Sequence, residues 1–180
     1  MSLRLVILNP AAGRGRVRRE WPRMAEALRA AGVGFDLVET KAPGEAVDIA
    51  QRAALEYDAV IAAGGDGTVH EVVNGLLRAG GGAALGVLPL GSGDDFVKML
   101  PLGDAVERIR RSQPKALDAG RIRAAGAERY FANGMDIGFG AHASRNVRRV
   151  PRFMTGLGAY LGALALTLVR YPKLEVRLQL

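Results

Sequence analysis

The sequence contains no cysteine and few aromatic residues. Without cysteine the chain forms no disulfide bond and offers no thiolate to a metal, and nothing in it indicates an oxidising compartment. Aromatic residues make up 6% of the chain, too few to interleave with the basic residues in a base-stacking surface, so nucleic acid is not an expected partner. The apolar run at residues 5–8 is too short for a secretory signal.

Positive charge is in excess. The 180 residues carry a formal net charge of +7 and a pI near 10.4. Such a balance predicts an acidic partner, and a nucleotide or an anionic lipid surface would both meet this description. With 49% hydrophobic and 24% charged residues, the composition is that of a globular protein.

Apolar segments of strand length alternate with segments of helical period in the first part of the chain. The pattern predicts strands at residues 3–8, 33–39, 59–63 and 84–88, and helices at 22–31, from 45 onward, 69–77 and 104–111. Pro22 is expected in the first turn of the first helix, a position that suits proline. The predicted fold class is therefore α/β, with a doubly wound and mostly parallel sheet.

Three of the predicted strands end in loops rich in glycine. These loops cover residues 9–16, 64–68 and 89–96. In a parallel sheet the loops at the carboxyl ends of the strands gather along one edge, and glycines let a phosphate approach the backbone. The helix after the middle loop also offers unpaired N–H groups to an anion. The sequence therefore favours a phosphate-binding site at this edge.

Asp66 is the unusual residue of the middle loop, because a bare carboxylate repels a phosphate. A divalent cation between them would reverse the repulsion, and Mg²⁺ prefers hard oxygen ligands. The alternative is that Asp66 only caps the helix. The phosphate-binding lysine motif of Walker type is absent, so Arg14 and Arg16 are the candidates for a phosphate clamp. The alternative for these two is a solvated loop.

The pattern changes after residue 115. Residues 116–122 and 129–133 are predicted to pair as antiparallel strands, and residues 174–180 to form a strand with one apolar face. Such a strand needs pairing neighbours and a covering layer. We therefore expect an α/β nucleotide-binding domain at residues 1–115 and, at 116–180, the beginning of a β-rich second domain that is truncated. The alternative is that the last strand pairs with the hairpin.

A basic block precedes the longest apolar segment. The block consists of Arg145, Arg148, Arg149 and Arg152, and the segment covers residues 153–169. About 17 residues is the lower limit for a membrane span, and glycines dilute this one, so a helix buried against protein is preferred. The block is a candidate surface for an anionic membrane, where each arginine adds on the order of 1 kcal/mol. The alternative is a solvated face.

Several motifs together resemble the catalytic domain of the diacylglycerol kinase family. They are residues 9–13, 64–68 with Glu71, Asn74 and Gly75, and 89–96, and the resemblance also includes residues 117–120 and 130–133. The chain most resembles the soluble bacterial lipid kinases, which are related to sphingosine kinases and, more distantly, to NAD kinases and phosphofructokinases. This resemblance implies an ATP-dependent kinase that uses Mg²⁺ to phosphorylate the hydroxyl of a neutral lipid such as diacylglycerol.

The resemblance also implies the residues of the site. The ATP site would be lined by Asn9, Pro10, Ala11, Ala12, Gly13, Thr40, Gly65, Asp66, Gly67, Thr68, Val69, His70, Glu71 and Ser92, with Arg16 added as the candidate clamp. Asp66, Asp95 and Asp118 would lie near the metal or its waters. Asp94 stands where the family usually has asparagine, so its side chain is expected to face away from the phosphate or to cap its helix. His70 is expected to be a polar surface residue.

This chain is shorter than the family members that it resembles. Family members have a β-rich second domain that looks like the source of the general base, so this base is expected beyond Leu180. Two other functions remain open: a kinase for a soluble substrate such as NAD, and a non-catalytic ATP-binding fragment. The expected location is cytoplasmic and peripheral at the membrane. The expected partners are a lipid substrate at the membrane surface and a second copy of the chain in a homodimer.

Overall fold

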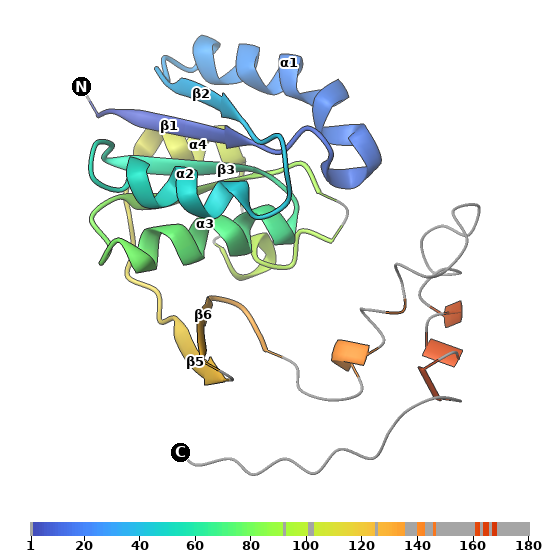
Figure 1. The fold of residues 1–180 in the computed structure, drawn as a ribbon. Coiled ribbons are helices and arrows are strands. Elements are labelled where there is room, and N and C mark those ends of the chain that lie inside the picture. Colours follow the sequence, from blue (N-terminus) through green and yellow to red (C-terminus); the bar gives the residue numbers. More distant parts are fainter. Residues whose placement is uncertain are drawn as a thin grey trace. The chain divides into compact units, whose positions relative to one another are not determined.

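A computed structural model of the chain describes residues 2–91, 93–100, 103–124, 126–135, 140–142, 146, 161–162, 164–165 and 167–168 (Figure 1). The chain divides into two compact units, residues 1–133 and 134–180. The expectations for Ser92, the basic block at 145–152 and the strand at 174–180 lie outside the described residues, as does most of the apolar segment at 153–169. The predicted domain boundary after residue 115 stays a prediction.

The first unit is built on a four-stranded parallel sheet. Its strands are β1 (Arg4–Leu8), β2 (Asp36–Glu39), β3 (Ala59–Gly64) and β4 (Ala84–Pro89), in the order β2-β1-β3-β4. Strand β1 pairs with β2 on one side and β3 on the other, with Val6 opposite both Leu37 and Ile61. Strand β2 is an edge strand, and all four of its residues are exposed.

Four helices cover the two faces of this sheet (Figure 1). They are α1 (Arg16–Ala30), α2 (Glu45–Ala53), α3 (Asp66–Arg78) and α4 (Ala105–Arg111), with short 3₁₀ turns at Ala12–Gly15 and Val97–Met99. The side chains of β1 alternate between the faces. Leu5 and Ile7 join the cluster made with α2 and α3, whereas Val6 and Leu8 join the cluster made with α1 and α4. The doubly wound α/β prediction is confirmed.

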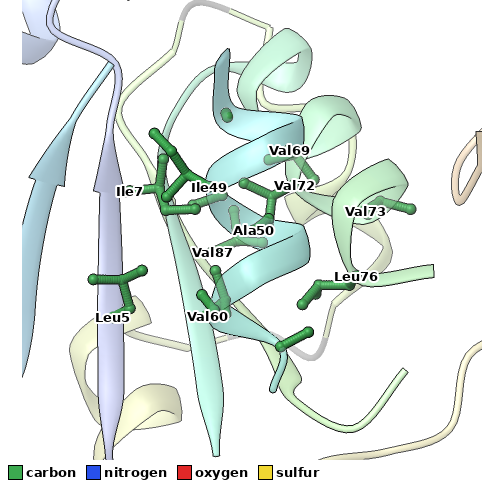
Figure 2. Close-up of a cluster of buried hydrophobic side chains, with 14 of the residues drawn as sticks. Leu5, Ile7, Ile49, Ala50, Val60, Val69, Val72, Val73, Leu76 and Val87 are labelled. Atoms are coloured by element: carbon green, nitrogen blue, oxygen red, sulfur yellow. The ribbon is translucent and has the colours of Figure 1, made fainter. Parts of the chain in front are cut away.

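Helices α2 and α3 pack closely against each other and against one sheet face, as the labelled side chains of Figure 2 show. Ile49 and Ala50 of α2 and Val72 and Leu76 of α3 belong to this cluster. Gly75 allows the close approach, because a Cβ atom at this position would lie 2.3 Å from the carbonyl oxygen of Val47. The α2–α3 layer therefore has no room for a side chain at position 75.

A two-stranded antiparallel sheet follows α4. It consists of β5 (Gly120–Ala124) and β6 (Ala127–Phe131). The hairpin was expected, but at residues 116–122 and 129–133. The ring of Phe131 covers Gly120 so closely that a Cβ atom there would lie 2.1 Å from Cζ of the ring. In the observed register of β5 and β6, Gly120 lies opposite Phe131. An alternation of apolar and polar residues does not predict this pairing.

Two other predicted boundaries were wrong. Helix α1 begins at Arg16, directly after the 3₁₀ turn, and Pro22 lies inside it rather than in its first turn. A proline there deprives the carbonyl of Arg18 of its helical donor, and the helix tolerates this because Pro22 is exposed. Strand β2 begins only at Asp36, because Val33 is buried in the cluster beneath α1 and does not pair with β1.

No helix in the described part of the chain combines the length and the apolar character that crossing a membrane requires.

Candidate functional site

Strands β1 and β3 form the point at which the sheet changes winding direction. From β1 the chain passes through α1 to β2 on one side, and from β2 through α2 to β3 on the other side of β1. Loops at the carboxyl ends of such neighbouring strands diverge to opposite faces and leave a crevice, which is where open α/β sheets bind ligands. The loops after β1 and β3 are the first two glycine-rich loops of the sequence.

The loop after β1 is fixed to the loop after β3 by Asn9. Its main-chain N–H donates to the carbonyl of Ala63 at 3.0 Å, and its Nδ2 donates to the hydroxyl of Thr68 at 3.1 Å. Its Oδ1 accepts from the N–H of Ala11 at 3.2 Å. Asn9 therefore uses both ends of its side chain to shape the site, while Pro10, Ala11 and Ala12 form the turn that follows.

Gly13 closes this first loop in a conformation that favours glycine. Its φ is +59°, and a Cβ atom would lie 3.2 Å from Cβ of Arg16 and 3.4 Å from the carbonyl oxygen of Leu90. The loop after β1 thus reaches the loop after β4 as well. All three glycine-rich loops meet at one edge of the sheet, as the sequence predicted.

The loop after β3 leads into α3 with very little space around it. A Cβ atom on Gly64 would lie 2.4 Å from the hydroxyl oxygen of Thr68, and one on Gly91 would lie 2.4 Å from Cα of Gly65. By contrast, a Cβ atom on Gly67 would meet nothing within 4 Å. The first N–H groups of α3, at Asp66 and Gly67, have no partner within the helix, and Gly67 is exposed with free space where a side chain would lie.

The loop after β4 is held in place by Asp66. One oxygen of this carboxylate, Oδ1, accepts from the N–H of Phe96 at 3.1 Å, and the other, Oδ2, lies beside Gly93. The N–H of Leu90 donates to the carbonyl of Gly64 at 3.2 Å. Asp66 bridges to the next loop through Oδ1, and no described residue donates a hydrogen bond to its Oδ2.

Asp94 stabilises the same loop from within. Its Oδ1 accepts from the N–H of Gly91 at 3.1 Å, and its φ of +51° is one that asparagine and aspartate tolerate better than most residues. Burial raises the pKa of Asp94 above its usual range; the Gly91 hydrogen bond opposes this shift and the nearby Asp66 charge adds to it. The side chain thus turns into its own loop and bonds a residue before it, rather than capping the helical turn that follows.

The three aspartates assigned to the metal are not equally placed. A Cβ atom on Gly93 would lie 2.7 Å from Oδ2 of Asp66 and 3.7 Å from Oδ2 of Asp95, so both carboxylates border one point. Asp95 also pairs with Lys98 at 2.5 Å and is largely exposed. Asp118 is exposed in the segment before β5. Among the described residues, no group of three or more His, Cys, Asp or Glu side chains is arranged to hold a metal.

Arg16 contacts main chain in the loop after β4. Its Nε donates to the carbonyl of Leu90 at 3.3 Å, its Nη2 donates to the carbonyl of Gly91, and Nε also lies 3.4 Å from a carboxylate oxygen of Glu20. The guanidinium that was assigned to a phosphate therefore already joins two loops. Arg14, the other candidate, is exposed and has a φ of +57°.

The remaining predicted site residues surround the start of α3. Thr40 follows β2, is buried, and donates its N–H to the carbonyl of Leu8 at 2.9 Å. Glu71 accepts from the N–H of Gly44 at 3.0 Å and so fixes the loop that leads to α2. Val69 is a core residue whose side chain lies in the α2–α3 cluster. His70 is exposed, as predicted.

Asn74 has a structural role that the sequence did not reveal. It is 1% exposed, its Nδ2 donates to the carbonyls of His70 and Tyr130, both at 2.9 Å, and its Oδ1 accepts from the N–H of Tyr130 at 3.0 Å. The side chain thus pairs with Tyr130 as a strand would and attaches β6 to α3. The only signal in the sequence is an asparagine among the apolar residues of the helix.

The fold and the site define a doubly wound α/β protein whose glycine-rich loops meet at the switch point of its sheet. A family model, the diacylglycerol kinase catalytic domain, matches residues 4–122 of the 180. The chain therefore belongs to the diacylglycerol kinase catalytic-domain family.

Named relatives agree with this assignment. The chain is 36% identical over 133 residues to a diacylglycerol kinase of Staphylococcus aureus (strain MRSA252), covering 71% of this chain and 41% of the relative. It is 34% identical over 134 residues to a diacylglycerol kinase of Bacillus subtilis (strain 168), covering 71% and 43%. The crystal structure of a diacylglycerol kinase from Bacillus anthracis strain Sterne matches with a TM-score of 0.58 and 30% identity, covering 72% and 47%. The chain thus spans less than half the length of these relatives.

Proposed function

We propose that the loops at the edge of the sheet bind ATP together with Mg²⁺, and that the protein to which they belong transfers the terminal phosphoryl group to the hydroxyl of a neutral lipid such as diacylglycerol. The observation that supports this most directly is the exposed start of α3 at Gly67, where a Cβ atom would meet nothing within 4 Å. It lies at the first turn of a thirteen-residue helix, where free N–H groups and the helix dipole both favour an anion.

The shape of the site fits a polyphosphate. Gly65 and Gly91 let the loops after β3 and β4 approach to the contact of their main chains, so main chain rather than side chain lies beside the start of α3. Main-chain N–H groups do not ionise and are held by the sheet and α3, and phosphoryl transfer depends chiefly on positioning and charge neutralisation. Asn9 and Thr68 fix the loops in this arrangement and donate no charge.

The donor set also fits Mg²⁺. Asp66 keeps Oδ2 available, and Asp95 borders the same point. Magnesium usually takes only one or two carboxylates from the protein and completes its octahedron with water and phosphate oxygens, so the absence of a three-carboxylate group in the described part of the chain is compatible with it. Bound there, the ion would supply the positive charge that an aspartate beside a phosphate requires.

The proposal of a lipid acceptor is supported by the relatives, and that of a membrane surface by the charge of the chain. Those named above are called diacylglycerol kinases, and a basic chain of +7 suits an anionic membrane and a nucleotide equally. We propose that the protein acts at the cytoplasmic membrane surface.

Gly67→Ala is the sharpest test of the nucleotide site. The added methyl group lies in the free space beside Gly67 and meets no other protein atom. Alanine is also favoured over glycine inside a helix by up to about 1 kcal/mol. We therefore expect stability to rise slightly while calorimetry shows at least about tenfold weaker binding of ATP and ADP in Mg²⁺, which corresponds to about 1.4 kcal/mol.

Gly34→Ala serves as the matched control. Gly34 is also exposed and has free space around it, but it lies before β2, away from the three loops. Its substitution should leave nucleotide affinity unchanged. The proposed nucleotide site is wrong if the parent, Gly67→Ala and Gly34→Ala bind ATP with equal affinity, or if the parent chain does not bind ATP. Transfer of labelled phosphate to diacylglycerol, ceramide, sphingosine or NAD then tests the acceptor, and transfer to NAD alone would replace the lipid assignment.

A further inference from the structure

The dipeptide Asn-Gly occurs twice in the sequence, at Asn74–Gly75 and at Asn133–Gly134. Asn-Gly is the dipeptide most prone to spontaneous deamidation, because glycine has no side chain to hinder attack by its own main-chain nitrogen. The structure places the two copies in opposite environments. One is in the middle of α3, and the other lies where the first compact unit ends and the second begins.

We propose that Asn133 is a site of spontaneous deamidation and isomerisation, whereas Asn74 is protected by the fold. Asn133 and Gly134 are both exposed and belong to no helix or strand. No hydrogen bond joins the Asn133 side chain to any described residue, and a Cβ atom on Gly134 would meet nothing within 4 Å. Among the described residues, therefore, nothing holds the side chain away from the N–H that follows it.

Both groups that must move for the reaction at Asn74, its side-chain amide and the N–H of Gly75, are held by the fold. Its amide makes hydrogen bonds to the main chain of His70 and Tyr130. The N–H of Gly75 lies within α3, where it belongs to the helical hydrogen-bond ladder. Gly75 is also pressed against Val47 of α2. Reaction at Asn74 requires local opening of α3, whose core face is buried.

The reaction needs only water. The main-chain nitrogen of Gly134 loses its proton and attacks Cγ of Asn133, a new C–N bond closes a five-membered imide, and the Cγ–Nδ2 bond breaks to release ammonia. Water then opens the imide. Attack at Cγ yields aspartate, and attack at the main-chain carbonyl yields isoaspartate, in which the chain continues through Cγ. Either product adds one carboxylate, and the second also lengthens the backbone at the joint between the two units.

Peptide mapping of the intact chain measures both sites at once. Cleavage after lysine and arginine places the two asparagines in separate peptides, residues 53–78 and 130–145, each with a single asparagine. After incubation in mildly alkaline buffer, we expect peptide 130–145 to gain the mass that accompanies replacement of an amide by a carboxyl group. Peptide 53–78 should react at least about a hundredfold more slowly, the rate loss that a local opening cost of about 2.7 kcal/mol produces.

Three controls make the result decisive. In concentrated urea the two rates should converge, because both asparagines then lie in an unfolded chain. Gly134→Ala should slow the reaction at Asn133, and Asn133→Gln should abolish it at this peptide, in each case without changing the rate at Asn74. The proposal is wrong if native Asn133 is slowed relative to the urea-unfolded chain as strongly as Asn74 is, or if Asn74 reacts as fast as Asn133 in the folded protein.

Discussion

Arg16 links two of the glycine-rich loops through main-chain carbonyls. Its guanidinium donates to the carbonyls of Leu90 and Gly91 and thereby joins the loops after β1 and β4. Hydrogen bonds from a charged donor to a carbonyl contribute about 1.5–3 kcal/mol each at most, and half exposure lowers this value. Arg16 is thus a positioning residue for the loop that carries Asp94 and Asp95.

Replacing Arg16 by methionine should loosen this loop even without nucleotide. We expect a loss of about 1–2 kcal/mol in the free energy of unfolding, together with faster hydrogen exchange at the N–H groups of Gly91 and Phe96. Arg16→Lys should recover only part of both effects, because an ammonium group lacks the planar fork that reaches two carbonyls. Urea unfolding and exchange mass spectrometry measure the two quantities.

Arg19→Met is the control for charge, since Arg19 is an exposed residue of the same helix. It should change neither quantity beyond about 0.5 kcal/mol. If the N–H groups of the ligand-free loop exchange hydrogen at the same rate in Arg16→Met and in the parent, Arg16 does not hold the loop. The hypothesis that Arg16 clamps a phosphate would then be favoured again.

At this scale the sequence predicted that the three glycine-rich loops converge, but not which contacts their residues make. Asn9, Asp66 and Gly67 were identified correctly as residues of the converging loops, because glycine-rich turns after apolar strands are a local pattern. The partners of Arg16, Asp66 and Asn74 lie 74, 30 and 56 residues away along the chain. No local pattern reports such a pairing, so these roles came only from the structure.

Among the elements, α4 is short and depends on charges at its surface. Asp104 caps it by accepting the N–H of Glu107 at 3.0 Å. Glu107 in turn bonds Arg110 and Arg111 at 2.6 and 2.7 Å. These two guanidinium groups, Arg110 first, lower the pKa of Glu107 to about 2. The carboxylate is therefore favoured by the folded state.

The stability that Glu107 contributes should depend on pH in a defined direction. Because its pKa is lower in the folded chain than the ordinary 4.5, the contribution is complete above pH 4.5 and is lost as the pH falls through about 2. Glu107→Gln should therefore be less stable than the parent at neutral pH, and the difference should shrink between these two values. Urea unfolding across this range tests it; a difference independent of pH would contradict the ion-pair explanation.

Element boundaries were less predictable than element types. The four strands and four helices of the sheet unit were all expected, since their apolar periods differ clearly. The start of α1 was not, because the 3₁₀ turn at Ala12–Gly15 places the helix start before Pro22. The short length of β2 depends on burial of Val33 under α1, which is a tertiary contact.

For the whole molecule, the location of the core predicts which part of the chain folds alone. Both clusters of buried residues in the described structure lie within the first unit, residues 1–133. We expect a chain ending at Asn133 to unfold cooperatively, with a Tm within about 3 °C of that of the full chain, by calorimetry. Loss of the cooperative transition would show that residues 134–180 stabilise the sheet unit.

The overall arrangement of strands and helices was predicted from the sequence better than the element boundaries or the roles of single residues. Alternation of strands and helices allows few arrangements once crossovers are right-handed, and both faces of the sheet are covered as this rule requires. Glycine-rich loops at strand ends then meet at one edge for topological reasons. The proposed lipid acceptor could not be predicted in this way, because the sheet and its loops do not specify the residues that would contact it.

The exposed strand β2 has a consequence for the behaviour of the protein in concentrated solution. An edge strand can pair with its copy in another molecule and begin aggregation. If two copies of β2 met antiparallel with Leu37 opposite Val38, Asp36 of each would face Glu39 of the other, and like charges opposite one another destabilise a sheet. The four-residue edge therefore repels its own copy, and this repulsion protects the protein against precipitation through β2.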